Sequence, residues 1–210
     1  MASNFGKTIQ VSTFGASHGY AIGGIVEGLP CGHTIDIDEL QAFLKRRAPG
    51  QNQLQTQRKE ADIPEFLSGM VDGMLSGSPL AFMIRNTSQH SGDYNNLRDI
   101  PRPSHADFTA RMRYGNKVDM RGGGHFSARL TAPLCVAGGI ALQLLREKGI
   151  EIHGHLKQVG TIQDAPIDMV HPDMKAFSKI ATEPIAMLDA RKRSEVENLV
   201  MKLKKDGDST

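Results

Sequence analysis

The chain has 210 residues, 39% of them hydrophobic, with 25 Lys and Arg against 23 Asp and Glu, so a folded core is expected and wholesale disorder is excluded. Its longest nearly apolar stretch, residues 132–145, is shorter than the roughly 18 residues of a membrane span, and no apolar signal region opens the chain. Cys31 and Cys135 are too few for a disulfide scaffold, so we expect a cytoplasmic protein without membrane association.

The first third of the chain predicts two strands and a helix. Residues 8–14 alternate between apolar and polar side chains, which indicates a strand, and residues 24–29 form a second predicted strand. Residues 15–19 therefore lie in the loop that joins them. Residues 36–47 predict a helix with Asp36 as its N-cap.

The middle of the chain is less regular. Residues 67–75 and 80–85 predict two strands joined by a hairpin at residues 76–79. Residues 86–124 are rich in Arg, Pro and Gly and show little periodicity, so we expect a long functional loop. Residues 131–145 predict a helix that is buried on all sides, because apolar residues cover its whole circumference.

The last third predicts a strand at residues 150–156, surface structure at residues 165–183 and an amphipathic helix at residues 194–205. A helix enclosed by antiparallel strands predicts an α+β fold. His153 and His155 would share one face of the predicted strand, but no acidic or Cys partner is expected nearby. We therefore expect an exposed strand edge there and no metal site.

Positive charge is concentrated between Lys45 and Arg129, where 13 basic residues face 8 acidic ones and ten of the 13 arginines lie. The planar guanidinium group binds carboxylate and phosphate through two hydrogen bonds. These arginines are scattered among Gly, His and Ser and do not repeat along helices, so a convergent anion site and a solvated basic face are both open at this point. A nearly neutral total charge and few aromatic residues disfavour nucleic-acid binding.

A glycine-flanked turn at residues 15–19 places Ser17 next to His18. Glycine lets the backbone approach a ligand closely. The Gly-x-Ser-x-Gly spacing also has the form of an esterase nucleophile elbow, but that motif needs a helix after the serine, whereas a strand is predicted here. We therefore do not expect an esterase.

Three further segments could carry chemistry. Residues 102–107 contain His105 two residues after a proline, whose ring restrains the backbone near the imidazole. Residues 122–124 are three glycines that lead into a predicted helix, and their backbone N–H groups suit a phosphate at the positive end of the helix dipole. Arg46 and Arg47 end the helix at residues 36–47, where cations would also stabilise the helix dipole.

In this order, these segments resemble the signatures of the chorismate synthase family. The resemblance spans essentially the whole chain and rests on six motifs, at residues 15–19, 46–50, 57–62, 67–69, 102–107 and 121–129. It implies a β-α-β sandwich with helices packed between antiparallel sheets, in a single domain over residues 1–210 that assembles as a homotetramer.

The resemblance also implies an activity. It implies a lyase that converts 5-enolpyruvylshikimate 3-phosphate to chorismate and phosphate by 1,4-elimination, the last step of the shikimate pathway of aromatic amino acid biosynthesis. Reduced FMN is the implied cofactor. An intrinsic NADPH-dependent activity and an external partner are both open as the source of its electrons.

The resemblance implies roles for ten residues. His18 lies near the leaving phosphate and protonates it, and His105 lies close to the flavin and sets its protonation. An imidazole suits both tasks because its ordinary pKa of about 6.5 lets it exchange a proton near neutrality. The other implied residues bind anions: Ser17, Arg47 and Arg129 for the substrate, and Arg102, Gly122, Gly123, Gly124 and Ser127 for the cofactor.

The sequence departs from the family in three respects. Ala16 stands where the family has an acidic or hydroxyl residue, residues 51–53 supply no arginine for the substrate, and the chain is shorter than the family. We expect a C-terminally truncated chain that lacks further flavin contacts and an aspartate implicated in proton abstraction. A competent enzyme, a non-catalytic fragment that associates with itself or a partner, and a phosphate-ligand binding protein all stay open.

Overall fold

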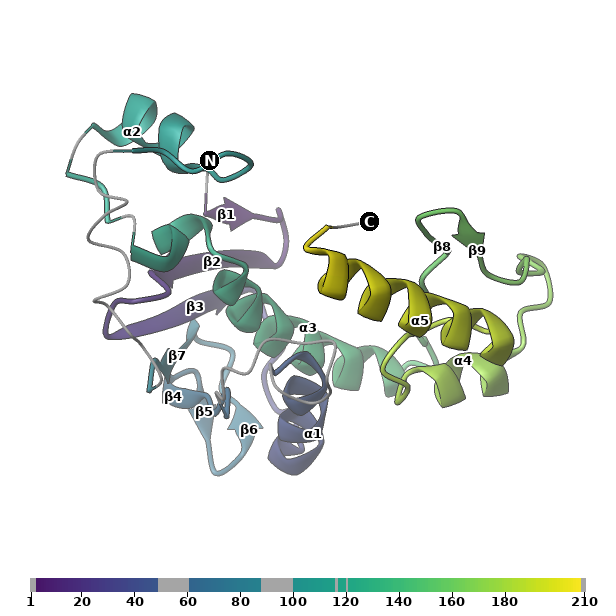
Figure 1. The fold of residues 1–210 in the computed structure, drawn as a ribbon. Helices are drawn as coiled ribbons and strands as arrows, with labels where there is room; N and C mark the ends of the chain where they lie inside the picture. The colour runs from purple at the N-terminus through teal and green to yellow at the C-terminus, as the bar shows by residue number, and fades with distance from the viewer. Residues whose placement is uncertain (1–2, 49–60, 88–99, 116, 120, 209–210) are drawn as a thin grey trace. The chain divides into compact units, whose positions relative to one another are not determined.

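The computed structural model describes residues 3–48, 61–87, 100–115, 117–119 and 121–208 (Figure 1). The described residues up to Gly149 form one compact unit, unit 1, and those from Ile150 onward form a second, unit 2. Residues 49–50 and 57–60 of two of the six motifs and the departure from the family at residues 51–53 lie outside the described residues.

Unit 1 is built on a five-stranded antiparallel sheet with the strand order β1-β2-β3-β7-β4. Its strands are β1 (Asn4–Phe5), β2 (Gln10–Gly15), β3 (Ala21–Glu27), β7 (Leu80–Arg85) and β4 (Glu65–Ser68). The strands predicted at residues 8–14, 24–29 and 80–85 are confirmed, although β3 begins three residues earlier than expected. The loop at residues 15–19 therefore lies between β2 and β3, as predicted.

The single strand predicted over residues 67–75 is wrong. Only its start lies in β4, which pairs with β7, and the chain then forms a separate hairpin of β5 (Met70–Val71) and β6 (Met74–Leu75). The backbone has a positive φ at Gly69, Asp72 and Gly73, with values of 83°, 49° and 78°. An Asp-Gly pair favours a two-residue hairpin turn, because both of its residues tolerate positive φ.

Two helices cover one face of the sheet: α1 (Ile37–Arg47) and α3 (Thr131–Arg146), which contact each other, while α3 also contacts β2 and β3 (Figure 1). Leu80, Phe82 and Ile84 alternate along β7 and are almost fully buried. They share one hydrophobic core with Leu40 of α1 and Ile140 of α3. Burial of such side chains is the main force that holds this layer together.

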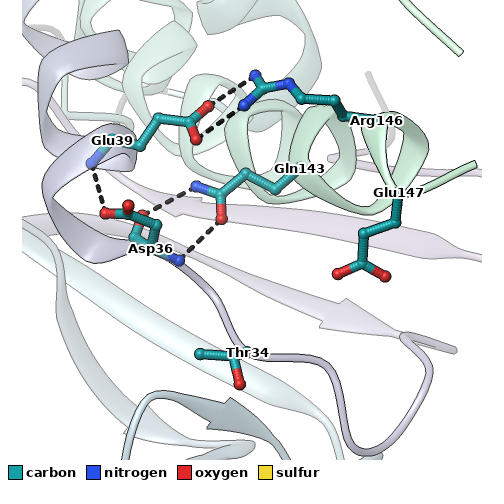
Figure 2. Close-up of a pocket in the computed structure, with 6 residues that line it drawn as sticks. All are labelled: Thr34, Asp36, Glu39, Gln143, Arg146 and Glu147. Atoms are coloured by element: carbon teal, nitrogen blue, oxygen red, sulfur yellow. Dashed lines mark hydrogen bonds and ion pairs between the residues drawn. The ribbon is translucent and has the colours of Figure 1, made fainter. Parts of the chain in front are cut away.

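Side chains at the end of α3 are hydrogen-bonded to the start of α1, an arrangement called here the clasp (Figure 2). Asp36 is the predicted N-cap, and its Oδ1 accepts a hydrogen bond from Glu39 N at 2.8 Å. The Gln143 amide accepts from Asp36 N at 2.8 Å and donates to Asp36 O at 2.9 Å, while Arg146 donates to both Glu39 carboxylate oxygens. The helix predicted at residues 36–47 is thus confirmed together with its cap.

The expectation that the helix at residues 131–145 is buried on all sides is wrong within the described residues. Val136 and Ile140 are fully buried, but Leu134 on another side is 38% exposed. By length and composition alone, Ala128–Arg146 is the one described helix that could cross a membrane. Its contacts with the sheet and with α1 make it the core helix of unit 1.

Unit 2 contains a short hairpin and two helices. They are β8 (Gln158–Val159), β9 (Ile162–Gln163), α4 (Met174–Ile180) and α5 (Ala190–Asp206). The helix predicted at residues 194–205 is confirmed as α5, whose Val196 is buried against Ile185 and Met187. Helices and antiparallel sheets together confirm the α+β class.

The strand predicted at residues 150–156 is wrong, since no described residue there lies in a strand. Ile150 and Ile152 are 47% and 61% exposed. Leu156 N donates a single backbone hydrogen bond to Ala186 O at 2.7 Å. The alternating pattern was present, but no second strand pairs with it in the described part of the chain. The segment at residues 165–183, predicted as surface structure, contains the short helix α4.

Candidate functional site

Two hollows of unit 1 are lined by residues that the structure describes. The larger, of about 550 Å³, surrounds the clasp between α1 and α3, where the polar groups of Asp36, Glu39, Gln143 and Arg146 already pair with one another (Figure 2). The smaller, of about 300 Å³, is lined by Ser104, His105, Ala106, Asp107, Gly122, Gly123, Phe126, Ser127 and Ala128. The smaller hollow is the candidate site, because it brings an imidazole, two serine hydroxyls and a glycine-rich backbone together.

The loop between β2 and β3, residues 16–20, is called here the His18 loop. Gly19 N donates to Ala16 O at 3.0 Å, which closes a tight turn. Ser17 and His18 are both buried, at 0% and 6% exposure. Ser17 N donates to Gly124 O at 3.1 Å, so the loop is hydrogen-bonded to a segment more than 100 residues away.

Ser17 also joins the His18 imidazole to the glycine residues. Its Oγ donates to Arg121 O and Gly122 O, each at 3.3 Å, and lies 3.2 Å from His18 Nδ1. Carbonyl oxygens can only accept, so the hydroxyl hydrogen points to them and His18 Nδ1 is the donor to Ser17 Oγ. This arrangement fixes the orientation of the imidazole ring.

The segment Arg121–Phe126, called here the glycine segment, has a backbone that only glycine adopts easily. Gly122, Gly123 and Gly124 have φ values of 59°, 96° and 56°. A Cβ atom at position 122 would lie 2.0 Å from His18 Cε1, and one at position 124 would lie 1.9 Å from Asp119 O. The absence of side chains is therefore what lets the His18 loop lie against this segment.

An ion pair borders the glycine segment. Arg121 Nε and Nη2 donate to the two carboxylate oxygens of Asp119 at 2.9 and 2.7 Å. These bonds are the main cause that lowers the pKa of Asp119, and the charge of His18 acts in the same direction. Asp119 therefore stays ionised at neutral pH.

His105 lies in the loop of residues 102–107, called here the His105 loop, just before α2 (Asp107–Tyr114). Helix α2 corrects the expectation that residues 86–124 form one long loop. The His105 side chain lines the candidate site and its Nδ1 donates to Pro103 O at 3.0 Å. Ser104 has a φ of 58°, a left-handed conformation that is uncommon for a residue other than glycine.

An ion pair fastens the two ends of the His105 loop. Arg102 Nε and Nη2 donate to Asp107 at 2.8 and 2.9 Å, and Arg102 N donates to it at 3.0 Å. The side-chain hydrogen bonds from Arg102 are the largest cause that lowers the pKa of the buried Asp107 to about 2. Arg102 thus closes the loop that carries His105, while its predicted contact with the cofactor stays a prediction.

The two imidazoles adjoin the same glycine. The His18 ring lies against Gly122, and Gly122 also lines the hollow that His105 borders. Ser127 lines this hollow too, and its Oγ accepts from Arg129 N at 3.2 Å at the start of the short helical segment Ala128–Leu130. The structure thus brings together most of the residues that the sequence singled out.

Arg47 and Arg129, called here the arginine pair, meet at Asp62. Arg47 donates to Asp62 Oδ2 through Nε at 3.0 Å and through Nη2 at 2.7 Å, and Arg129 Nη1 donates to Asp62 Oδ1. Asp62 and Arg129 are both buried, at 2% and 6% exposure. Two guanidinium groups thus converge on one carboxylate here, and guanidinium groups are well suited to bind anions.

The structure adds three residues that the sequence analysis did not single out as site residues. Asp62 joins the arginine pair. Asn86 contacts both Arg129 and the His18 loop. His125 Nδ1 donates to Gly15 O at 2.9 Å, and its Nε2 lies 2.6 Å from Ser3 Oγ, so it fastens the glycine segment to β2.

The expectation that His153 and His155 have no acidic partner is wrong. His153 Nε2 lies 2.9 Å from Glu151 Oε2, and His155 Nδ1 lies 3.2 Å from the buried Asp164 Oδ2. Neither histidine lies in a strand. Across the described ranges, no group of three or more His, Cys, Asp or Glu side chains is placed to hold a metal ion.

Comparison with known proteins gives one consistent family. The sequence profile of the family described as chorismate synthase matches residues 9–210. A chorismate synthase of Lancefieldella parvula is 46% identical over 191 residues, which cover 90% of this chain and 50% of that protein. A chorismate synthase of Bacteroides thetaiotaomicron is 43% identical over 209 residues, which cover 100% of this chain and 57% of that protein.

A solved structure described as the crystal structure of chorismate synthase has the same fold. It matches with a TM-score of 0.70 at 24% sequence identity, over 96% of this chain and 54% of that one. The chain spans about half the length of the curated relatives it matches.

Proposed function

This chain belongs to the chorismate synthase family, and from that premise we propose that its protein is a lyase that converts 5-enolpyruvylshikimate 3-phosphate to chorismate and phosphate. The reaction is a 1,4-elimination, in which the substrate loses a ring proton and its phosphate ester, and it would form the last step of the shikimate pathway. The observation that carries the proposal is the position of Gly122, which adjoins His18 and also lines the hollow bordered by His105.

The arginine pair is proposed to bind the anionic substrate. The substrate carries two carboxylates and a phosphate, and guanidinium groups match both kinds of anion through paired hydrogen bonds. Asp62 accepts hydrogen bonds from both Arg47 and Arg129 and so holds the two guanidinium groups next to each other. Ser17, which is hydrogen-bonded to the glycine segment, would lie at the same end of the substrate.

His18 is proposed to protonate the departing phosphate. In the imidazolium form both ring nitrogens carry a proton: Nδ1 donates to Ser17 Oγ, and Nε2 would transfer its proton to a phosphate oxygen and leave the neutral ring. Proton transfer lowers the negative charge on the leaving group as its bond to carbon breaks. Burial of His18 keeps bulk water from competing for that proton.

Reduced FMN is the proposed cofactor, and its polar groups fit the candidate site. The hollow offers the backbone of Gly122 and Gly123, the hydroxyls of Ser104 and Ser127 and the imidazole of His105. Such donors suit a phosphate or the polar edge of a flavin. When bound, the reduced flavin supplies an electron transiently, without net oxidation. His105 would hold a proton next to the ring, and Arg102 would keep the His105 loop in place.

The remaining proposals concern the whole protein. We propose that residues 1–210 belong to one chorismate synthase domain, and that the protein is a cytoplasmic homotetramer that binds neither nucleic acid nor membranes. NADPH or a partner reductase would supply the electrons for the flavin. Cys31 and Cys135 are both free thiols, in agreement with a reducing compartment.

Anaerobic incubation with reduced FMN and 5-enolpyruvylshikimate 3-phosphate tests the proposal. Chorismate and inorganic phosphate should form in equal amounts, and His18→Ala and His105→Ala should each lower the rate at least tenfold. His33→Ala is the matched control, because His33 pairs with Glu147 near the other end of α3. The absence of both turnover and flavin binding would favour a non-catalytic fragment. Phosphate binding without a preference for flavin would favour a phosphate-ligand binding protein.

A further inference from the structure

Asn86 follows β7 and is buried, with only 8% of its surface exposed. Both hydrogens of its side-chain amide are used on the His18 loop, because Nδ2 donates to Ala16 O at 3.0 Å and to Gly19 O at 2.8 Å. Its backbone N also donates to Tyr20 O at 3.1 Å. Asn86 therefore contacts the first, the fourth and the fifth residue of a five-residue loop.

The other end of the same amide contacts the arginine pair. Arg129 Nε donates to Asn86 Oδ1 at 3.2 Å, and Arg129 in turn donates to Asp62, which also binds Arg47. A continuous hydrogen-bonded chain thus runs from Arg47 through Asp62, Arg129 and Asn86 to the His18 loop. Hydrogen bonds between buried polar groups are strong and hold the groups they join in a defined geometry.

Only an asparagine satisfies all of these partners at this position. An aspartate could still accept from Arg129, but its second oxygen would face the Ala16 and Gly19 carbonyl oxygens and repel them. An alanine would leave both carbonyl oxygens and the Arg129 Nε without this partner. A buried polar group that loses its partner is costly, so the loop would move to regain one.

We propose that Asn86 is a positioning residue that sets the His18 loop relative to the arginine pair. The anion-binding guanidinium groups and the proton-transferring imidazole come from segments far apart in the sequence, and the Asn86 side chain bonds directly to both segments. Without it the arginine pair still binds an anion, but the imidazole is no longer held at the leaving group. The effect on turnover rests on the proposed function, whereas the effect on the loop does not.

Hydrogen exchange of the backbone amides tests the positioning without any need for turnover. In Asn86→Asp, the Gly19 amide should exchange at least tenfold faster than in the wild type, while amides of β3 and β7 change by less than threefold. Gln143→Glu is the matched control, since Gln143 is an equally buried amide (9% exposed) that bonds to the backbone of Asp36. It should leave Gly19 exchange unchanged.

Steady-state kinetics of the same variants in the anaerobic assay give the second readout. Asn86→Ala should lower kcat at least tenfold with a change in KM below threefold, and Gln143→Ala should change neither. A fall in kcat without a change in KM indicates lost positioning, because a general loss of structure would change both. Asn86→Ala also serves the exchange experiment if Asn86→Asp does not fold.

Two results would overturn the proposal. One is an unchanged Gly19 exchange rate in the Asn86 variants, or a rise that the amides of β3 and β7 share equally. The other is an active wild type whose kcat is unaffected by Asn86→Ala. A wild type without turnover would instead refute the proposed function, and the exchange rates alone would then decide the role of Asn86.

Discussion

Gly122 lies directly against the imidazole of His18, so that a Cβ atom at position 122 would be 2.0 Å from Cε1 and 2.1 Å from Nδ1. No real side chain tolerates such a contact without displacement of one of the two groups. Gly122 also lines the hollow that His105 borders, so this glycine adjoins both the His18 ring and the hollow of His105. The His18 ring can thus lie against the glycine segment because Gly122 has no Cβ atom.

Gly122→Ala should therefore displace the His18 ring and lower kcat for 5-enolpyruvylshikimate 3-phosphate at least tenfold. Gly123→Ala is the matched control for the ring position, because Gly123 also has a positive φ, while its Cβ would meet only Ser127 Cβ at 3.6 Å. NMR of the histidine ring measures the displacement in both variants, and steady-state kinetics in the anaerobic assay measure kcat of Gly122→Ala. An unmoved His18 signal in Gly122→Ala would show that the ring is not held against this glycine.

Asp62→Ala should be strongly destabilising, because it leaves Arg47 and Arg129 without the carboxylate that separates their charges. Removal of one partner of a buried ion pair costs about 3–5 kcal/mol. Glu65→Gln breaks the exposed ion pair with Arg85 and should cost less than about 1 kcal/mol. The free energy of unfolding in urea measures both. Equal losses in the two variants would contradict the central role of Asp62.

The ion pair between Arg102 and Asp107 predicts a stability that depends on pH. The pKa of Asp107 is about 2 in the folded protein, below its ordinary value of 3.8, so the stabilisation is complete above about pH 5 and is lost as the pH falls toward 2. The shift corresponds to about 2 kcal/mol. Asp107→Asn should therefore unfold more easily than the wild type at pH 7, and the difference should shrink below about pH 5. A difference that stays constant with pH would contradict this account.

Elements with local signals were predictable from the sequence. Asp36 caps α1 because its carboxylate reaches Glu39 N three residues later, and this signal depends on no distant residue. The turn signal at Asp72 and Gly73 is equally local, but the apolar residues on both sides of it predict one continuous strand where the structure has a hairpin. The alternation at residues 150–156 predicted a strand wrongly, because periodicity reports a pattern of side chains and not the presence of a pairing strand.

The candidate site was predictable only in part. His18, His105 and the glycines stand in compact motifs whose residue types suggest chemistry. Asp62 ends the motif at residues 57–62 and Asn86 stands in none, and neither role is visible locally, because their partners are far away in the sequence: Arg129 follows Asp62 at a separation of 67 positions. An asparagine directly after a strand has no local signature of burial, and only the folded chain shows which groups it joins.

The shared site of His18 and His105 is the central claim, and NMR of the two histidine rings during a titration with 5-enolpyruvylshikimate 3-phosphate tests it most directly. His18→Gln and His105→Gln would assign the signals, and the exposed His171 of unit 2 would serve as the reference that stays unchanged. The account predicts that both ring signals shift with a single dissociation constant. A shift of only one of them, or two dissociation constants that differ by tenfold or more, would contradict it.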